Sequence, residues 1–575
     1  MTADLILKGS TIITMDPALP RAEAVAVDTS TGVIAAVGTL VDCQAAAPGV
    51  TPTDLSGTVL MPGFIEAHSH PLVAGIYTQQ PSYWISRSQG YATYAEVTAL
   101  WRKLDASLPA GDPVLCWGLE RPTQGAPELT NTDLDVFFHK RPAMILDISG
   151  HEAYFNSAAI AFNGWTGGRP PADPPASRFG RNADGTSNGR AYETAAVEIA
   201  AGKVQQAVVT HPLLSAAKWF VELAKAGVTT TADNAFSLAS LAGYEALASS
   251  ADCPVRVGYF HVSTEVGAGE PVASKVPTDR LWKAGIKFWA DGTTFNGTLA
   301  ASFPFLDSAT TTSAQIPLGP GAEKMTNYTR SQYDALLDQF ADGGWQIATH
   351  AHGDVAIDLV LDAYAAVLTR HGLLGTDHRW RVEHWSAGRA DQFRRAVDLG
   401  VCTPMAAYQF IQLGDLLDGE LLASAIGSQW VAAGDAIKAG ATVSFHSDSP
   451  VAPVNPLNDM QCMATRRSWS GRVHGANQSI SLDDALKAHT INAAYHLRRE
   501  HDLGSITPGK LADFVELSAD PYTADFGALS DQVTVLGTWC NGRKIDTETF
   551  LADIAQTNPT EHAGLHDHAL KTKHC

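Results

Sequence analysis

Val59-Leu60-Met61-Pro62-Gly63-Phe64-Ile65-Glu66-Ala67-His68-Ser69-His70 is an apolar run that ends in two histidines one residue apart. The run has the composition of a buried strand that enters a loop. Side chains two positions apart in an extended chain point the same way, so His68 and His70 would leave the carboxyl end of this strand together. Two such imidazoles can bind one metal ion, and barrel enzymes carry their chemistry at that end of the strands. Because the chain has 20 histidines, one such pair also arises by chance. Other residues of the sequence are needed to decide whether this pair binds a metal ion.

Eight β-like runs, separated by helical patterns, organise the middle of the chain. They cover residues 59–66, 228–232, 255–261, 286–290, 346–350, 381–385, 402–406 and 442–446. The helical period is clearest at 354–371 and 482–497, which we expect in an outer ring of helices. Alternating strands and helices indicate an α/β protein with a parallel sheet, and eight strands close a (β/α)8 TIM barrel.

Other regions surround the predicted barrel, which spans 59–504. The two chain ends, 1–58 and 505–550, contain short alternating runs and turns, and we expect them to pair into one small composite β-sandwich domain. Residues 72–215 exceed one strand-to-helix step and include a Gly/Pro/Arg-rich stretch at 167–175. This composition indicates an insertion, or lid, over the barrel mouth.

Composition limits the class of protein and its partners. The 575 residues are 45% apolar and 17% charged, with a formal net charge of −20, which disfavours nucleic acid and anionic membranes and suits a small neutral or cationic substrate. The seven cysteines are scattered, and residues 1–20 lack the pattern of a secretory signal, so we expect a cytoplasmic protein with reduced thiols. A homodimer is the default expectation. The end of the chain, 551–575, is expected to be a flexible tail in spite of its four histidines at 562, 566, 568 and 574.

Six side chains with metal or acid–base chemistry fall at the ends of the predicted strands. They are His68 and His70 after the first run, Lys287 in the fourth, His350 ending the fifth, His384 in the sixth and Asp448 after the eighth. Each has an ordinary alternative, since a single histidine can be a hydrogen-bonded rim residue and an aspartate can cap a helix. Together on one rim, imidazoles and a carboxylate are the donors that zinc prefers. The pattern therefore predicts one or two divalent ions, most simply zinc.

The local sequences around these residues form an ordered set of motifs. The set comprises Met61–His70, Gly285–Gly292 with a K-x-x-x-D-G pattern, Thr349–Asp354, Arg381–His384, Ser447–Val451, Thr490–Ala494 and Gly504–Asp513. In order and content the set resembles the amidohydrolase superfamily, within it the YtcJ-like branch that includes N-substituted formamide deformylases. The resemblance covers nearly the whole chain, with one departure at His352, where the family usually has an apolar residue.

The resemblance implies a role for each residue of the rim. The implied metal ligands are His68, His70, Lys287, His350, His384 and Asp448. The first two would bind a more buried ion, the histidines at 350 and 384 a more exposed one, and a carbamylated Lys287 would bridge both. Asp448 would also be the general base that takes a proton from the activated water.

Three further residues are expected to contact the substrate. His151, within a G-H-x-x-x-x-N-S segment, would meet the substrate carbonyl or the leaving group. His352 would be either a third imidazole on the rim or a partner behind a metal ligand. Trp289, with the tryptophans at 84, 117 and 165, would line an aromatic pocket.

Two other residues are expected to support the metal ligands. Asp354 would either accept a hydrogen bond from His350 or cap the helix that begins there. His446 lies two residues before Asp448 and therefore faces the same way, which places it behind the metal ligands.

The predicted activity is hydrolysis of an amide-type C–N bond of a small molecule, with an N-substituted formamide or another N-acyl compound as the preferred substrate. A deaminase or a cyclic-amide hydrolase is the alternative, because the same attack by activated water serves those reactions. A non-catalytic binding protein on the same barrel is a remoter alternative. It would have lost metal ligands, and the sequence keeps all of them.

Overall fold

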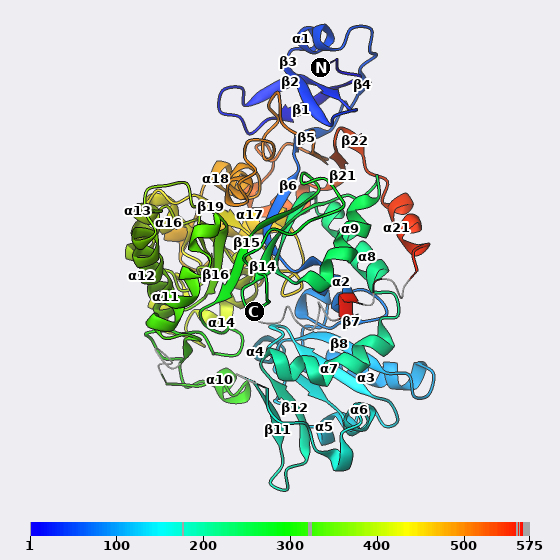
Figure 1. The fold of residues 1–575 in the computed structure, drawn as a ribbon, viewed down its shortest axis with the longest axis vertical. Coiled ribbons are helices and arrows are strands. Elements are labelled where there is room, and N and C mark those ends of the chain that lie inside the picture. Colours follow the sequence, from blue (N-terminus) through cyan, green and yellow to red (C-terminus); the bar gives the residue numbers. More distant parts are fainter. Residues whose placement is uncertain (1, 175–176, 320–324, 559–561, 563, 567–575) are drawn as a thin grey trace.

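Figure 1 shows the computed structural model of the chain, which describes residues 2–174, 177–319, 325–558, 562 and 564–566. A parallel sheet of eight strands forms its centre, in the order β19-β18-β17-β16-β15-β14-β13-β6. These strands are β6 (Phe64–Ser69), β13 (Val228–Phe236), β14 (Arg256–Val262), β15 (Leu281–Trp289), β16 (Gln346–Ala351), β17 (Arg381–His384), β18 (Thr403–Met405) and β19 (Val443–Phe445). Each of the eight apolar runs supplies one of them, which confirms the predicted TIM barrel.

Side-chain and loop contacts hold the seam where β6 meets β19. The backbone N–H and the Oγ of Ser447 both donate to Glu66 Oε2, at 3.0 and 3.1 Å. The backbone N–H of His70 donates to the carbonyl oxygen of Ser449 at 2.8 Å. The residues that follow β19, including Asp448, are thereby held against the end of β6.

The first apolar run is two strands rather than one. β5 (Val59–Pro62) pairs with β1 and β20 in a second sheet, and β6 begins after Gly63. A Cβ at Gly63 would lie 2.0 Å from Thr229 Oγ1, so no side chain fits at the point where the chain passes from one sheet to the other. The prediction that the barrel begins at residue 59 is therefore wrong, because the apolar run serves two sheets and only the glycine marks the change.

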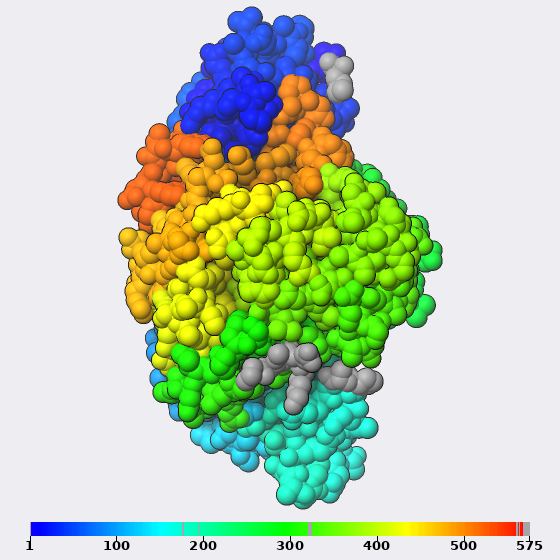
Figure 2. All heavy atoms as spheres, turned by 90° about the vertical axis from the view of Figure 1, so that its left-hand side faces the viewer, coloured from blue at the N-terminus to red at the C-terminus, as the bar shows by residue number. Residues whose placement is uncertain are grey.

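Both chain ends build the second sheet, in the order β22-β21-β20-β5-β1-β2-β3 with β4 against β1. Its strands besides β5 are β1 (Leu5–Ile13), β2 (Arg21–Asp28), β3 (Val33–Gly38), β4 (Thr53–Asp54), β20 (Phe514–Leu517), β21 (Val535–Cys540) and β22 (Arg543–Lys544), and α1 (Leu40–Ala46) lies beside them. Figure 2 shows the N-terminal segment, in blue, packed beside orange segments from the later part of the chain at one end of the molecule. The fully buried Arg256 of β14 ties this sheet to the barrel, because its Nε lies 2.5 Å from Asp513 Oδ2.

The insertion has a six-stranded sheet of its own, in the order β11-β12-β10-β9-β8-β7. Its strands are β7 (Tyr83–Trp84), β8 (Val114–Leu119), β9 (Ala143–Asp147), β10 (Glu152–Phe155), β11 (Arg178–Arg181) and β12 (Ser187–Tyr192), and its helices include α2 (Pro71–Thr78), α3 (Tyr94–Ser107), α4 (Arg121–Gln124), α5 (Asn131–Asp135), α6 (Ser157–Phe162) and α7 (Thr194–Val208). It lies at the end of the molecule opposite the composite sheet, beyond the barrel (Figures 1 and 2).

Helices cover the outside of the barrel. The main ones are α8 (Pro212–Lys225), α9 (Leu241–Ser249), α11 (Arg330–Asp338), α12 (Asp354–Arg370), α13 (Ala390–Leu399), α14 (Ala407–Leu417), α16 (Ala433–Lys438), α17 (Pro456–Thr465), α18 (Leu482–Ala488) and α19 (Ile491–His496). The predicted helix at 354–371 is present as α12. The one predicted at 482–497 is two helices, and at the break the carbonyl oxygen of His489 accepts the backbone N–H of Ile65 in β6. None of the helices in the described ranges is long and apolar enough to span a membrane.

Part of the predicted flexible tail is packed against the protein. Helix α21 (Thr547–Ala555) enters it, and Leu565 is 1% exposed where it meets Gly243. His566 Nδ1 lies 3.1 Å from Gln205 Nε2. His568 and His574 lie outside the described residues.

Candidate metal centre

A cavity of about 50 Å³ lies at the carboxyl ends of the barrel strands. Residues from the barrel and from the insertion line it. The barrel supplies His68, His70, His350, His352, His384, Tyr408 and Asp448, and the insertion supplies Trp117, Ser149, Gly150 and His151. The insertion thus forms one wall of the cavity, in keeping with a position over the barrel mouth.

The first group of possible metal ligands consists of His68, His70 and Asp448. Asp448 Oδ1 lies 3.2 Å from the Nε2 atom of each histidine. Tyr408 donates its hydroxyl hydrogen to the other carboxylate oxygen at 3.1 Å. Burial would raise the pKa of Asp448, but His68, together with hydrogen bonds from both histidines, holds it well below its usual value. The carboxylate is therefore ionised and faces the two imidazoles that the sequence paired.

The second group consists of His350, His352 and His384. The three ring centroids are separated by 4.4 to 4.5 Å, with the 352 and 384 rings stacked at 22°. His350 Nε2 lies 3.0 Å from the carbonyl oxygen of Gly292, and His352 Nδ1 lies 2.6 Å from Ser386 Oγ. His352, expected to contact substrate, therefore forms a possible ligand group with two of the predicted ligands.

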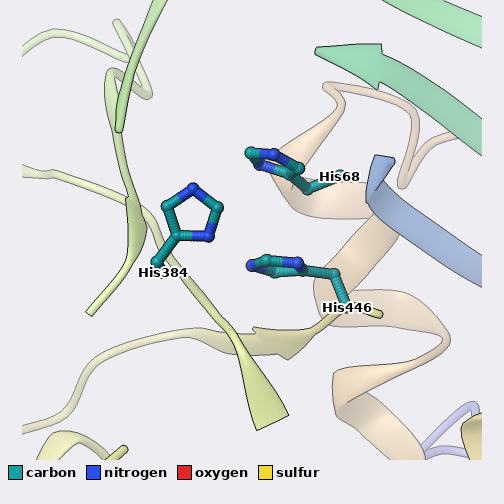
Figure 3. A group of neighbouring side chains, drawn as sticks. All are labelled: His68, His384 and His446. Atoms are coloured by element: carbon teal, nitrogen blue, oxygen red, sulfur yellow. The ribbon is translucent and has the colours of Figure 1, made fainter. Parts of the chain in front are cut away.

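A third group links the other two and includes His446 (Figure 3). The ring of His446 stacks on that of His68 at 4.6 Å and 16°, and His384 faces both. Its ligand nitrogen lies within 4.8 Å of those of its two neighbours. His446 thus stands beside the predicted ligands rather than only behind them.

The donors in this cavity fit a divalent metal ion. Both ring nitrogens of His384 and of His446 are buried and make no hydrogen bond within the described residues. Burial is the main cause that lowers the pKa of both rings well below the usual value, so both are neutral and carry a lone pair. Buried polar atoms without partners are costly, and a cation that accepts their lone pairs removes that cost.

Glu383 is a supporting residue that sequence reasoning missed. Its Oε2 lies 2.6 Å from His68 Nδ1, and both carboxylate oxygens accept hydrogen bonds from Arg381 at 2.7 and 2.8 Å. Burial opposes the charge, but Arg381 and then His68 hold the pKa of Glu383 far below its usual value. The carboxylate of Glu383 holds the proton of His68 on Nδ1. The lone pair of the ring is therefore on Nε2, which faces Asp448. The R-V-E-H motif carried this signal, because its arginine and glutamate are two positions apart and therefore lie on the same face of β17.

Asp354 does not orient His350, and that prediction is wrong. Its carboxylate accepts hydrogen bonds from Ser302 and from Arg389, and Gly353 rather than Asp354 is the N-cap of α12. The carbonyl oxygen of Gly292, 3.0 Å from His350 Nε2, takes the expected place, and Asp291 Oδ1 lies 3.7 Å from the same nitrogen. Burial raises the pKa of Asp291 to about 7, although three backbone N–H groups donate to it.

Lys287 and Trp289 lie behind the cavity wall on β15. Lys287 is fully buried, and its Nζ lies 5.6 Å from the centroid of the Trp289 ring. Trp289 packs with Ala235 and Val262 and is not among the residues that line the cavity. The tryptophan that lines the cavity is instead Trp117 of the insertion, whose Nε1 donates to the carbonyl oxygen of Pro450 at 3.1 Å.

Comparisons with known proteins agree with this geometry. A family model described as the amidohydrolase family matches residues 53–545. The N-substituted formamide deformylase of Arthrobacter pascens is 27% identical over 571 residues, which cover 94% of this chain and 97% of that protein. The putative amidohydrolase YtcJ of Bacillus subtilis (strain 168) is 25% identical over 533 residues, covering 90% and 95%. The solved structure of an uncharacterized metal-dependent hydrolase from Pyrococcus horikoshii OT3 has a TM-score of 0.69 at 21% identity and covers 91% of this chain and 99% of that one.

Replacement of Glu383 by glutamine should weaken metal binding. The amide no longer enforces a proton on His68 Nδ1, so the affinity for zinc should fall roughly 10- to 100-fold. Competition between the protein and a chromophoric chelator measures this affinity. The matched control is Glu120→Gln, a buried glutamate of the insertion whose partners are Arg87 and Thr123. Equal zinc affinity in the Glu383→Gln variant and in the wild type would show that this carboxylate does not support the metal site.

Proposed function

Because the chain belongs to the amidohydrolase family, we propose that this metal-dependent hydrolase of C–N bonds cleaves the amide bond of N-substituted formamides or closely related N-acyl compounds. The observation that carries the proposal is the group of imidazoles and the Asp448 carboxylate around a cavity of about 50 Å³ at the carboxyl ends of the barrel strands. This narrow space favours a compact acyl group such as formyl. The formamide deformylase among the relatives supports the same substrate class.

We place a divalent ion, zinc by its preference for nitrogen and oxygen donors, among His68, His70, His350, His384 and Asp448. When bound, such an ion lowers the pKa of water and polarises a carbonyl group. A carbamylated Lys287 is part of this proposal, since an ammonium in so buried a position beside imidazoles is costly. Electron density extending from its Nζ in a crystal structure of the metal-loaded protein tests the modification, and an unmodified amine would exclude it.

Asp448 and His151 have different roles in the proposed reaction. Asp448, oriented by the hydroxyl of Tyr408, accepts a proton from the water that attacks the carbonyl carbon. It then delivers that proton to the nitrogen as the C–N bond breaks, which releases formate and an amine. His151, on the wall formed by the insertion, binds the carbonyl oxygen as negative charge develops there.

A panel of matched amides tests the substrate class. We expect release of formate from N-substituted formamides, with kcat/KM at least about tenfold above that for the matching acetamides, because an extra methyl group overfills the cavity. Formate and amine are both quantified by chromatography. Cyclic amides and amino-substituted heterocycles are included as the competing substrates. Ammonia from such a heterocycle, with no formate from any formamide, would favour the deaminase alternative and contradict the proposal.

Replacement of Asp448 by asparagine should separate proton transfer from metal binding. The amide keeps the size of the side chain but cannot accept the proton, so kcat should fall by roughly 10²- to 10⁴-fold. Zinc content, measured by elemental analysis, should stay near the wild-type ratio because the histidines remain. His68→Ala is the contrasting variant, in which zinc content itself should fall. An Asp448→Asn protein that retains most of its turnover would exclude Asp448 as the general base.

A further inference from the structure

Glu193 lies directly behind His151, the residue of the insertion that reaches the metal cavity. Its Oε2 is 2.7 Å from His151 Nδ1. Its backbone N–H donates to the carbonyl oxygen of His151, also at 2.7 Å. The ring of His151 is largely buried and borders the cavity. One residue therefore holds both the backbone and the side chain of His151.

The backbone of Glu193 has a conformation that suits glycine. Its φ of 61° and ψ of 160° fall in a region that residues with a Cβ rarely occupy. Glu193 is also the N-cap of α7, yet its side chain makes no capping hydrogen bond there. Serine, threonine, aspartate or asparagine would cap this helix better, and glycine would fit its backbone better. A residue that suits its local structure so poorly indicates that its side chain is needed for something else.

The rest of the loop that carries His151 is already fixed. Ser149 donates its backbone N–H and its hydroxyl to Asp147 Oδ1 at 2.9 and 2.6 Å, and Asn296 Nδ2 donates to Ser149 Oγ at 3.0 Å. The backbone N–H of His151 donates to the same hydroxyl oxygen at 3.2 Å. With the backbone held in this way, the rotation and the tautomer of the imidazole are the remaining freedoms, and the carboxylate of Glu193 controls both.

We propose that Glu193 is a positioning residue, which acts through His151 on the carbonyl oxygen of the substrate. A carboxylate can only accept a hydrogen bond, so Nδ1 of His151 carries a proton. A ring protonated on both nitrogens donates from Nδ1 to Glu193 and from Nε2 to the oxygen that becomes negative during attack. The proposal rests on the proposed function, because it assigns His151 the role of binding that oxygen.

The electrostatics of the pair agree with this arrangement. Burial would raise the pKa of Glu193, but the charge and hydrogen bond of His151 lower it below its usual value. Other charged or titratable groups that act on these two residues are Asp147, Asp291, His350, His352 and Arg178.

A neighbouring glutamate offers a matched control. Glu193 and Glu128 border the same cavity of about 520 Å³. Glu128 pairs with Arg190 at 2.7 Å and accepts the hydroxyl hydrogen of Tyr192 at 2.7 Å. It does not line the metal cavity. Removal of its charge changes the same cavity and leaves the contact between Glu193 and His151 in place.

The first experiment measures turnover in a double-mutant cycle. Glu193→Gln should lower kcat and kcat/KM together by roughly 10- to 100-fold with unchanged zinc content, because the lost interaction forms in the transition state. Glu128→Gln should stay within about twofold of the wild type. In a His151→Asn protein, the further change Glu193→Gln should have almost no effect. Wild-type kcat in Glu193→Gln, or full additivity of the two substitutions, would overturn the proposal.

Two further readouts need no substrate, so they remain decisive if the formamide panel shows no activity and the proposed function fails. Glu193→Gly should unfold at the wild-type temperature or above it, because glycine accepts the backbone conformation without strain. In ¹⁵N-histidine NMR spectra, the resonance that His151→Asn removes should report a protonated Nδ1 in the wild type and should shift in Glu193→Gln. A lower unfolding temperature in Glu193→Gly together with an unchanged His151 resonance in Glu193→Gln would contradict the positioning role.

Discussion

Within the described residues, the barrel mouth buries imidazole nitrogens that make no hydrogen bond, and the surrounding structure has to accommodate them. His384 and His446 each bury two such nitrogens, and a buried polar atom left without a partner costs about 1–3 kcal/mol. Protonation gives no relief, because burial lowers the pKa of both rings well below the usual value. A shared cation does give relief, since each neutral ring offers a lone pair. The mouth of this barrel is therefore built to hold a metal ion.

The barrel strands end at one place, which brings the possible metal ligands together, and the backbone is locally strained there. His384 and Asp448 both lie in the left-handed region, with φ of 78° and 55°, where residues with a Cβ are uncommon. The buried pair of Arg381 and Glu383 then fixes His68 from behind. Strain of this kind persists where the surrounding structure compensates for it, and it gathers at functional sites. The barrel provides the rigid frame and the insertion provides the wall that closes the cavity.

Much of the barrel and of the group of possible metal ligands could be predicted from the sequence, because both leave local signals. An apolar run shows a strand, and a histidine at its end shows where a ligand can stand, as for His68 and His350. The parts that escaped prediction depend on contacts between residues distant in sequence. His68 and Glu383 are 315 residues apart, and His151 and Glu193 are 42 apart. The sheet of the insertion was also not predicted, because its short strands pair in an order that no local pattern encodes. The boundary between β5 and β6 was not predicted either, because a single glycine, Gly63, separates the two strands.

We expect the buried histidines at the barrel mouth to hold a metal ion. Diffraction data from crystals of the freshly purified protein, collected on both sides of the zinc absorption edge, can test this. We predict an anomalous peak inside the cavity, within bonding distance of ring nitrogens of His68 and His70 and of a carboxylate oxygen of Asp448. An empty cavity in protein that elemental analysis shows to be free of divalent metal, and that does not take up zinc on addition, would contradict this expectation.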